Sequence, residues 1–286
     1  MIKIENLNYI YQQGMPFEKA ALKNINLEIE SGSFTAIIGH TGSGKSTLIQ
    51  HLNALIAPTS GRIVINGCDI TEPGADLKKV RKMVGLVFQY PEYQLFEETV
   101  YKDIAFGPKN MGFSEDKIKE CVYSAAAATG ISEELLEKSP FELSGGQKRR
   151  AAIAGVLAMQ PEILILDEPM AGLDPHGRDN ILELLKSLHK ENEKRTIIFV
   201  SHSMEDVARI AESIVVLNKG SVAMHGTVGE VFSRSAELEK MGLAVPQVTA
   251  LFRELKESGL DLPQDIYTVK KAAEVIAESL RGGAAC

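Results

Sequence analysis

The sequence predicts an α/β fold whose core is a parallel sheet. Short apolar runs, typical of parallel strands buried on both faces, occur at 84–88, 163–166, 196–200 and 214–217. Segments with helical spacing of their apolar residues separate these runs, as at 181–188. A glycine-rich loop follows another apolar segment, 33–38, and leads into a helical pattern at 47–55. This alternation indicates helices packed on the faces of one sheet.

A smaller antiparallel β-subdomain is expected at the N-terminus. Apolar and polar positions alternate over the first thirty or so residues, a pattern typical of antiparallel strands with one wet face. The segment 63–65 is apolar and is followed by Asn66-Gly67, a dipeptide favoured in tight hairpin turns. This segment therefore continues the small sheet into a turn.

Two helical regions complete the predicted organisation. Between 89 and 160 the strand signal vanishes and helical sequence dominates, which predicts a helical subdomain inserted between two core strands. From about 227 the chain is charged and helical, and four apolar residues of the segment 270–280 share one face: Ala273, Ile276, Ala277 and Leu280. We expect a domain over 1–226, with the helical subdomain at about 89–160, and a small C-terminal helical extension over 227–286.

Composition indicates a globular protein without a membrane-spanning segment. The 286 residues are 44% hydrophobic and 24% charged, which is ordinary for a soluble protein. The formal charge of −7 argues against a broad nucleic-acid-binding surface. No apolar stretch is long enough to cross a bilayer, and the N-terminus lacks the pattern of a signal peptide. Three widely spaced cysteines suit a reducing cytosol and no metal site. Membrane association would therefore come through a partner.

Residues 39–46 form a complete G-x-x-x-x-G-K-[ST] motif between a predicted strand and a predicted helix. The glycines let consecutive backbone N–H groups converge on a phosphate, and the helix N-terminus adds favourable partial charge. Lys45 would reach the β- and γ-phosphates, and the Ser46 hydroxyl would be a ligand of Mg²⁺. The alternative is a Gly/Ser-rich turn with no ligand. With every fixed position filled, the motif predicts binding of a nucleoside triphosphate.

Two further motifs carry chemistry. The apolar strand 163–166 ends in Asp167, which is placed to hold Mg²⁺, and Glu168, which is placed to polarise a water for attack on the γ-phosphate. The segment 143–147, Leu-Ser-Gly-Gly-Gln, precedes a helix that we expect from about Lys148, and its exposed N–H groups and Ser144 hydroxyl form a second anion site. One triphosphate does not easily occupy both sites in a monomer. The economical solution is a two-fold dimer in which each Ser144 loop closes over the nucleotide on the other subunit's Lys45 loop.

In their order, these motifs resemble those of the ATP-binding-cassette (ABC) ATPases over residues 1 to about 226. The resemblance implies a P-loop NTPase core that binds ATP and Mg²⁺, with Asp167 as the Walker B aspartate and Asp174 in the D-loop. It implies catalytic roles for Glu168, the Q-loop Gln89 and the switch histidine His202, and a Mg²⁺ site at Ser46, Gln89 and Asp167. The implied nucleotide-binding residues are Tyr11, which stacks on adenine, and Gly39, His40, Thr41, Gly42, Ser43, Gly44, Lys45, Ser46 and Thr47. The implied signature, which serves the partner's nucleotide, is Leu143, Ser144, Gly145, Gly146 and Gln147.

Single residues among these keep simpler alternatives. Tyr11 could pack on the β-subdomain, Gln89 could be a polar strand terminus, and His202 could cap the next helix. The basic run 148–150 is interpreted as a solvated helix face.

The resemblance narrows to the ATPases of energy-coupling factor (ECF) transporters. The segments 88–100, 105–108, 155–159 and 171–178 look like that group, and the segments 14–18 and 50–55 resemble the second of its two A-component paralogues. This likeness implies an ATPase at the cytoplasmic face of the cell membrane that powers import of a vitamin or metal micronutrient. Its partners would be a second ABC ATPase subunit, either a paralogue or a copy, a membrane T-component and a substrate-binding membrane S-component, with no nucleic acid. ATP would close the dimer, and hydrolysis would reopen it.

The segment after Gln89 is expected to form one wall of the groove that receives helices of the T-component. It offers an aromatic and apolar patch rimmed with negative charge, made of Tyr90, Tyr93, Leu95 and Phe96 beside Glu92, Glu97 and Glu98. The alternative is ordinary packing of a loop and helix on their own subdomain.

Three rival functions remain. A conventional ABC importer would share the chemistry but have another membrane partner. A soluble cassette protein acting on DNA or ribosomes would want a long coiled-coil insertion or a second cassette, and the 286 residues hold neither. A non-hydrolysing regulatory module is disfavoured by the intact Asp167, Glu168 and His202.

Overall fold

A six-stranded sheet forms the centre of the computed structural model, which describes residues 1–260, 262–263 and 265–283. Its strand order is β10-β9-β3-β8-β7-β6. The parallel strands are β3 (Phe34–Gly39), β6 (Val84–Val87), β7 (Ile163–Asp167), β8 (Thr196–Val200) and β9 (Ser213–Asn218), and β10 (Ser221–Thr227) pairs antiparallel with β9. Every residue of β3, β6, β7 and β8 is buried. The predicted parallel α/β core is confirmed.

The N-terminal subdomain is a four-stranded antiparallel sheet in the order β2-β1-β4-β5. Its strands are β1 (Ile2–Tyr11), β2 (Lys19–Ile29), β4 (Ser60–Ile65) and β5 (Cys68–Asp69). The expected turn at Asn66-Gly67 joins β4 to β5. The buried side chains of this sheet pack with α1 (Lys45–Leu52) against one face of the central sheet.

The strands of the central sheet alternate between two cores, because successive side chains of a strand point to opposite faces. In β8, Ile198 and Val200 face the N-terminal subdomain, whereas Ile197 and Phe199 face the helices on the other side. Those helices include α7 (Pro175–Glu191) and α8 (Met204–Ile210). The ends of the parallel strands are thus held between two packed layers.

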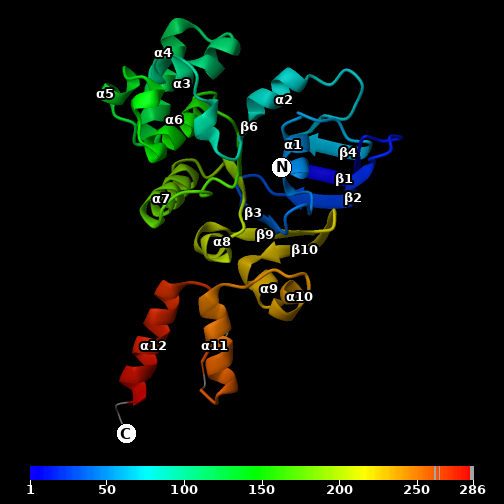
Figure 1. Cartoon of the computed structure of the whole chain (residues 1–286), viewed down its shortest axis with the longest axis vertical. Coiled ribbons are helices and arrows are strands. Elements are labelled where there is room, and N and C mark those ends of the chain that lie inside the picture. Colours follow the sequence, from blue (N-terminus) through cyan, green and yellow to red (C-terminus); the bar gives the residue numbers. More distant parts are fainter. Residues whose placement is uncertain (261, 264, 284–286) are drawn as a thin grey trace.

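A helical subdomain lies between β6 and β7 in sequence and stands beside the N-terminal subdomain (Figure 1). It contains η1 (Pro91–Gln94), α3 (Val100–Asn110), α4 (Glu115–Ala128), α5 (Glu133–Leu136), η2 (Pro140–Glu142) and α6 (Gly145–Leu157), and α2 (Leu77–Met83) precedes β6. Helix α6 begins three residues before the expected Lys148. Ser144 caps it, because its hydroxyl accepts the Gln147 N–H while the Gln147 side chain accepts the Ser144 N–H.

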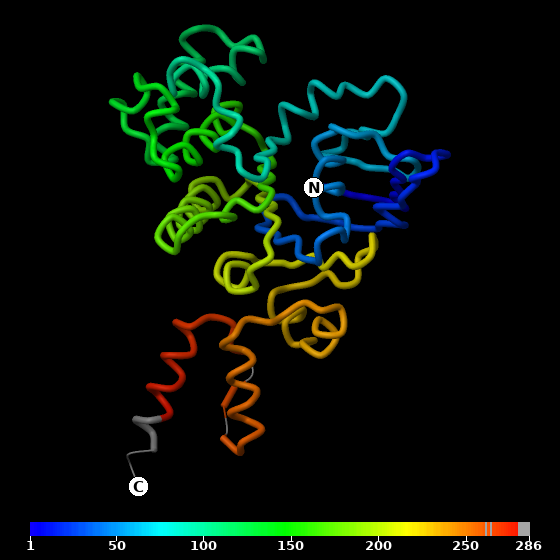
Figure 2. Tube along the Cα trace, viewed as in Figure 1, coloured from blue at the N-terminus to red at the C-terminus, as the bar shows by residue number. Residues whose placement is uncertain are grey.

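The chain after β10 has two parts. Helices α9 (Val228–Phe232) and α10 (Ser235–Lys240) pack on the main core, whereas α11 (Gln247–Glu257) and α12 (Val269–Gly283) share a small cluster around Phe252, Ile266 and Ala272. The trace shows these last two helices projecting side by side from the body (Figure 2). Within α12, Ala272 is buried, whereas Ala273, Ile276 and Ala277 are exposed; the side chain of Leu280 lies outside the described residues.

Within the described ranges, no helix combines the length and the apolar character that crossing a bilayer requires.

Candidate nucleotide site

The phosphate-type loop connects β3 to α1, and three of its glycines have positive φ angles. The φ angles are 153° at Gly39, 79° at Gly42 and 104° at Gly44. A Cβ on Gly39 would lie 2.3 Å from the Leu217 carbonyl oxygen, and one on Gly44 would lie 2.7 Å from that of Ala21. Because L-residues rarely adopt this conformation and backbone blocks the space, the loop requires glycine at these positions.

Lys45, the first residue of α1, is folded into this loop. Its ammonium Nζ donates to the carbonyl oxygens of Gly39 at 2.7 Å and His40 at 3.0 Å. Burial lowers the pKa of Lys45, while the nearby charges of Glu168 and Asp167 act in the opposite direction. The side chain thus provides a partly desolvated cation inside the loop, where a phosphate charge would interact with it strongly.

The second group of site residues follows the carboxyl ends of β6, β7 and β8. Burial raises the pKa of the Asp167 carboxyl group, and the neighbouring Ser46 side chain offsets part of the rise. One oxygen of Glu168 lies 2.6 Å from His202 Nε2, and the other accepts from Gln89 Nε2 at 3.4 Å. Glu168 has a φ of 49°, a conformation that costs energy outside glycine and is concentrated at functional sites.

Apart from Asp167, which is buried behind them, these side chains line one cleft of about 320 Å³. The structure therefore brings together predicted residues from four separate segments. The cleft is lined by Thr41, Gly42, Gly44, Lys45, Ser46, Thr47, Gln89, Glu168 and His202.

Tyr11 stands beside this cleft at the end of β1. Its hydroxyl lies 3.0 Å from Thr47 Oγ1. The rings of Tyr11 and Tyr9 meet edge to face, with their centroids 4.8 Å apart. Tyr9 makes the same type of contact with the buried His51. The Tyr11 side chain is 39% exposed, so its ring is held at the hydroxyl end and remains accessible to a flat ligand.

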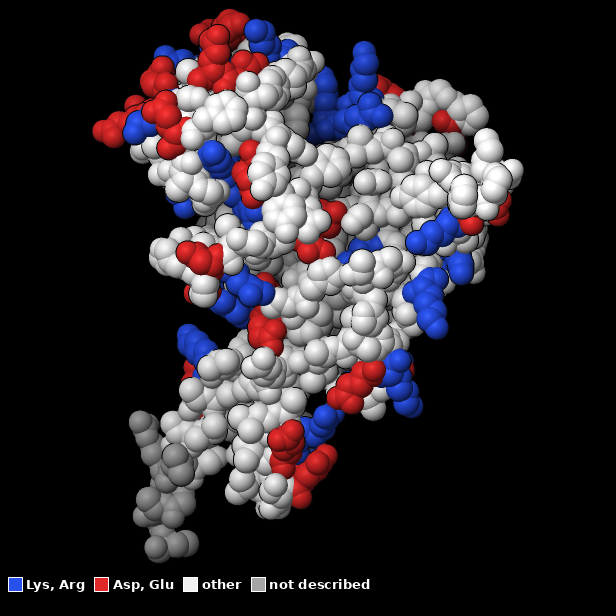
Figure 3. Space-filling model, viewed as in Figure 1, with Lys and Arg blue, Asp and Glu red and all other residues white. Residues whose placement is uncertain are grey.

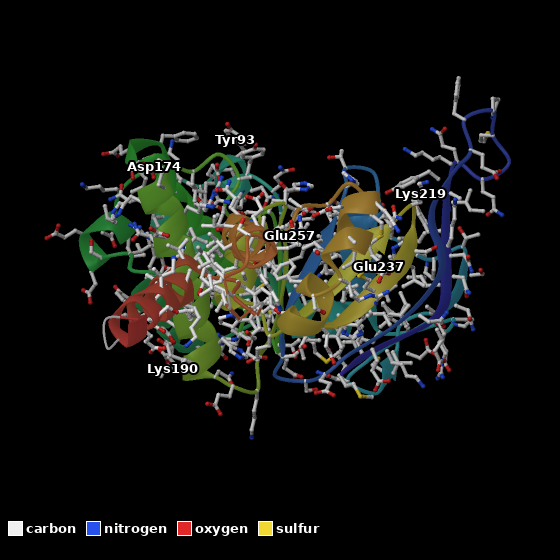
Figure 4. The ribbon with its side chains drawn as sticks, turned by 90° about the horizontal axis from the view of Figure 1, so that it is seen from below. Tyr93, Asp174, Lys190, Lys219, Glu237 and Glu257 are labelled. Carbon is white, nitrogen blue, oxygen red and sulfur yellow. The ribbon has the colours of Figure 1, made fainter. Side chains whose placement is uncertain are left out.

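The predicted signature residues lie in a different cleft, of about 700 Å³. Ser144, Gly145, Gly146 and Gln147 line it together with Asp174 of the D-loop, and Leu143 is buried just before them. Its lining residues do not overlap with those of the Lys45 cleft. Seen from below, Asp174 and Tyr93 lie near one another, away from Lys219, which neighbours the phosphate loop (Figure 4). The two predicted anion sites, at Lys45 and at Ser144, are therefore separate within a single chain.

Arg149 is a residue whose environment the sequence interpretation missed. The side chain is 1% exposed, so the expected solvated helix face is wrong at this position. It forms a bidentate ion pair with Glu92 and donates to the carbonyl oxygens of Pro169 and Ala171. The signal was its spacing: the buried Ile153 lies four residues further along the helix, on the same face.

The chain after β10 also reaches the phosphate loop, a contact that no local pattern indicates. A Cβ on Gly242 would lie 2.6 Å from His40 Nε2, and Lys240 and Met241 line a cleft of about 240 Å³ with residues 40–43. His40 is therefore in contact with the segment that follows α10.

An apolar groove of about 680 Å³ lies on the helical subdomain beside α2. Leu95 and Phe96 line it, as expected, whereas Tyr90, Glu92 and Tyr93 line the signature cleft. Lysine and arginine side chains gather over α2, and acidic ones over the helical subdomain (Figure 3). The groove lining contains Lys78, Arg81 and Lys82 together with one acid, Asp103, and the expected acids Glu97 and Glu98 are not part of it.

Comparison with known proteins agrees with this geometry. The family described as ABC transporter matches residues 22–171. The energy-coupling factor transporter ATP-binding protein EcfA2 of Caldanaerobacter subterraneus subsp. tengcongensis is 59% identical over 281 residues, which cover 98% of each chain. The protein of the same name from Clostridium perfringens is 57% identical, again over 98% of both chains.

Solved structures give the same assignment. The structure of cbiO1 from Clostridium perfringens, described as part of the ABC transporter complex cbiONQ, has a TM-score of 0.75 and 42% identity, covering 88% of this chain and 98% of that chain. The ATP-binding cassette MJ0796, in a dimeric post-hydrolysis state bound to ADP and Pi, has a TM-score of 0.70 and 31% identity, covering 80% and 99%. The chain is therefore an ABC ATPase that belongs to the EcfA2 family of energy-coupling factor transporter ATP-binding proteins.

Proposed function

We propose that this ATPase powers import of a vitamin or metal micronutrient through an ECF-type complex at the cytoplasmic face of the cell membrane. Two observations together carry the proposal. Lys45, Asp167, Glu168 and His202 converge at the carboxyl ends of the parallel strands, and the chain is similar to EcfA2 proteins over nearly its whole length. The alternative is a conventional ABC importer, which would use the same chemistry.

The residues of the Lys45 cleft fit ATP and Mg²⁺. The loop amides and the Lys45 ammonium would hold the β- and γ-phosphates. Ser46 and the neighbouring Asp167 offer the hard oxygen ligands that Mg²⁺ prefers, with Gln89 as a third. Among the described residues, no group of three His, Cys, Asp or Glu side chains could hold a metal, but Mg²⁺ is commonly bound by one or two carboxylates, waters and substrate phosphates. When bound, it would neutralise charge that develops on the phosphates.

Glu168 is the proposed general base. The contacts to His202 and Gln89 fix both of its carboxylate oxygens at the edge of the cleft. From there, Glu168 would accept a proton from the attacking water and orient it in line with the γ-phosphate. His202 would then contact the γ-phosphate, and Tyr11 would stack on the adenine.

The separate signature cleft supports the proposal that ATP is hydrolysed between two subunits. Ser144 and the amides of the first turn of α6 would contact a nucleotide held by the Lys45 loop of the other subunit. ATP would bind best to the closed pair and would thus shift the population towards closure, and hydrolysis would remove that preference. The second subunit is a paralogue or another copy of this chain.

The apolar groove is the proposed docking site for the membrane T-component, and an S-component would bind the cargo. Apolar side chains of a T-component helix would cover Phe96 and Phe106, whose rings meet edge to face at 5.1 Å. An arginine of that helix would approach the groove's carboxylate. No nucleic acid takes part in this scheme.

Partner identity separates the ECF complex from its rivals. Membranes solubilised in mild detergent should yield, by mass spectrometry, a T-component and an S-component with this chain. Recovery of a conventional two-domain permease in their place would support the alternative importer. Stimulation of turnover by DNA or RNA would instead favour a soluble cassette function.

The hydrolytic role of Glu168 is tested by Glu168→Gln, which keeps the shape but removes the base. We expect turnover to fall by about 10²–10⁴-fold, the usual contribution of a positioned base, while ATP binding persists and the ATP-bound dimer accumulates. Turnover is measured by phosphate release, and the dimer by light scattering. Retention of more than about a third of wild-type turnover, far above that range, would exclude this role.

A further inference from the structure

Arg149 joins three segments of the chain that carry different predicted motifs: the Q-loop, the signature and the D-loop. It lies in the second turn of α6, two residues after the last signature residue, Gln147. Its Nε and Nη2 donate to the two carboxylate oxygens of Glu92 at 3.0 and 2.5 Å. Its Nη1 donates to the carbonyl oxygens of Pro169 at 3.0 Å and Ala171 at 2.7 Å, in the segment that leads from Glu168 into the D-loop, residues 171–174. A single guanidinium therefore fixes the distances among the Q-loop segment, the signature helix and the D-loop segment.

The same elements line the docking groove. Glu92 belongs to η1, whose last residue, Gln94, lines the groove together with Leu95. Helix α6 is a wall of both clefts, because residues 144–147, 149 and 150 line the signature cleft and residues 151, 152, 155 and 156 line the groove. A displacement of Gln94 and Leu95 would therefore act directly on Glu92, the ion-pair partner of Arg149.

The chemistry at this position is specific to arginine. The rigid guanidinium fork bonds a carboxylate through two parallel N–H groups and still has donors for two carbonyl oxygens, whereas a lysine ammonium is a point charge. Tyr90 packs over the guanidinium at 5.9 Å, and a Cβ on Gly172 would lie 3.2 Å from the Tyr90 ring. The ion pair is almost fully desolvated, because the Arg149 and Glu92 side chains are only 1% and 16% exposed. Separating its members is therefore unfavourable.

We propose that Arg149 is a positioning residue that makes the signature, Q-loop and D-loop segments move as one unit, so that a partner docked in the groove sets the geometry of the signature cleft. This inference rests on the proposed function. Arg149 acts on the nucleotide of the opposite subunit through Ser144 and Asp174 and does not itself bind ATP.

The test compares Arg149→Gln with Lys148→Gln in the purified transporter complex. Lys148 is the preceding residue of the same helix and lies over the exposed Phe141, so its substitution removes the same charge without removing any contact of Arg149. We expect Arg149→Gln to lower kcat by about 10²-fold, as misplacement of a catalytic element by roughly 1 Å can do. The affinity of the isolated chain for ATP, measured by calorimetry, should stay unchanged, and Lys148→Gln should keep wild-type turnover.

Two further variants separate positioning from loss of folding. Glu92→Gln keeps the shape and removes only the charge, so it should lower kcat in the same direction, and Arg149→Lys should recover part of the turnover lost in Arg149→Gln. The double variant Glu92→Gln, Arg149→Gln should be no slower than Arg149→Gln alone, because both act through one contact. Additive losses, or an ATP affinity that falls in parallel with kcat, would overturn the inference.

Failure of this inference differs from failure of the proposed function. If Glu168→Gln abolishes turnover while Arg149→Gln retains it, only the role of Arg149 is wrong. If Glu168→Gln retains turnover, the hydrolytic site itself is misassigned, whatever Arg149 does.

Discussion

His51 is a fully buried histidine one turn beyond the phosphate loop. Its Nδ1 lies 2.7 Å from the Thr47 carbonyl oxygen, and its ring contacts Tyr9, which in turn contacts Tyr11. Burial lowers the pKa of His51 below its usual 6.5, and the Thr47 contact only partly opposes this. The neutral ring therefore belongs to the packing that holds the proposed adenine-stacking residue.

This pKa shift predicts a pH-dependent stability. The unfolded chain takes up a proton on His51 near pH 6.5, while the folded chain does not, so the stability present above pH 6.5 is lost as pH falls from there towards the lower folded pKa. The loss is at most about 1.4 kcal/mol per pH unit in that window, which corresponds to roughly 3–6 °C in Tm. Thermal melts at pH 7.5 and 5.5 should show a smaller drop for His51→Leu than for the wild type. His225→Leu, at an exposed position, should leave the drop unchanged; equal drops in all three would contradict the shift.

At the scale of elements, the contact between the segment after α10 and the phosphate loop predicts a measurable effect on ATP. Gly242→Ala places a methyl group 2.6 Å from His40 Nε2 and should displace that ring, weakening ATP binding by up to about tenfold, roughly 1.4 kcal/mol. The backbone at Gly242 has a φ of 68°, so alanine also costs about 1–2 kcal/mol of stability. Calorimetric titration with ATP measures the first effect, and thermal melting the second.

Two controls separate the contact from the strain. Gly130→Ala has the same φ of 68° and no neighbour within 4 Å of the new Cβ, so it should lower the Tm without changing ATP affinity. Adding His40→Ala to Gly242→Ala removes the clash and should restore the affinity but not the Tm. Equal affinities for all of these variants would show that the contact does not influence the loop.

The position of Ser144 at the start of α6 predicts that each subunit completes the nucleotide site of the other. Ser144→Arg should leave ATP binding to its own chain intact and abolish hydrolysis, because Ser144 would serve the partner's nucleotide. In dimers of this chain that combine Ser144→Arg with Lys45→Ala, one composite site contains both lesions and the other contains neither. Phosphate release should therefore recover partially on mixing. Demonstrated mixed dimers without recovery would argue against composite sites.

The sequence predicted what short-range rules determine. The loop glycines, the carboxyl-terminal strand residues and the cap at Ser144 all follow from local conformation and spacing. The structure places loop and strand-end residues in one cleft and shows Ser144 as the cap of α6, in a separate cleft. Arg149 was misjudged because its partner Glu92 lies 57 residues away and local patterns do not report such pairs. The contact of Gly242 with His40 joins segments that are far apart in the sequence and has no sequence signature. The start of α6 was placed too late because glycines disfavour a helix interior, whereas here they occupy its first turn.

At the scale of the whole molecule, the functional surfaces occupy different regions. The apolar groove lies on the helical subdomain beside α2, and α11 and α12 project from the opposite end, with the central sheet between them (Figure 1). In the groove, Asp103 accepts the backbone N–H groups of Phe96 and Glu97 at 3.1 and 3.3 Å, which fixes the lip that carries Phe96. Residues of α6 connect this lip to the signature cleft. The groove shares no lining residue with the Lys45 cleft, so we expect substitutions in the groove to leave the phosphate-binding residues intact.

The groove predicts where the membrane subunits bind. Phe96 and Phe106 are 60% and 44% exposed although their rings pack together, and such exposed apolar patches commonly mark interaction sites. The double variant Phe96→Ala, Phe106→Ala should lose the T- and S-components on affinity purification in mild detergent, because apolar area needed for docking is removed. Basal ATPase activity of the soluble dimer should persist, since neither ring lines a nucleotide cleft.

Phe141→Ala is the matched control, because Phe141 is 73% exposed on the same subdomain but lies outside the groove. If the double variant still retains its membrane subunits quantitatively, the docking surface lies elsewhere; if Phe141→Ala loses them equally, the effect is not specific to the groove.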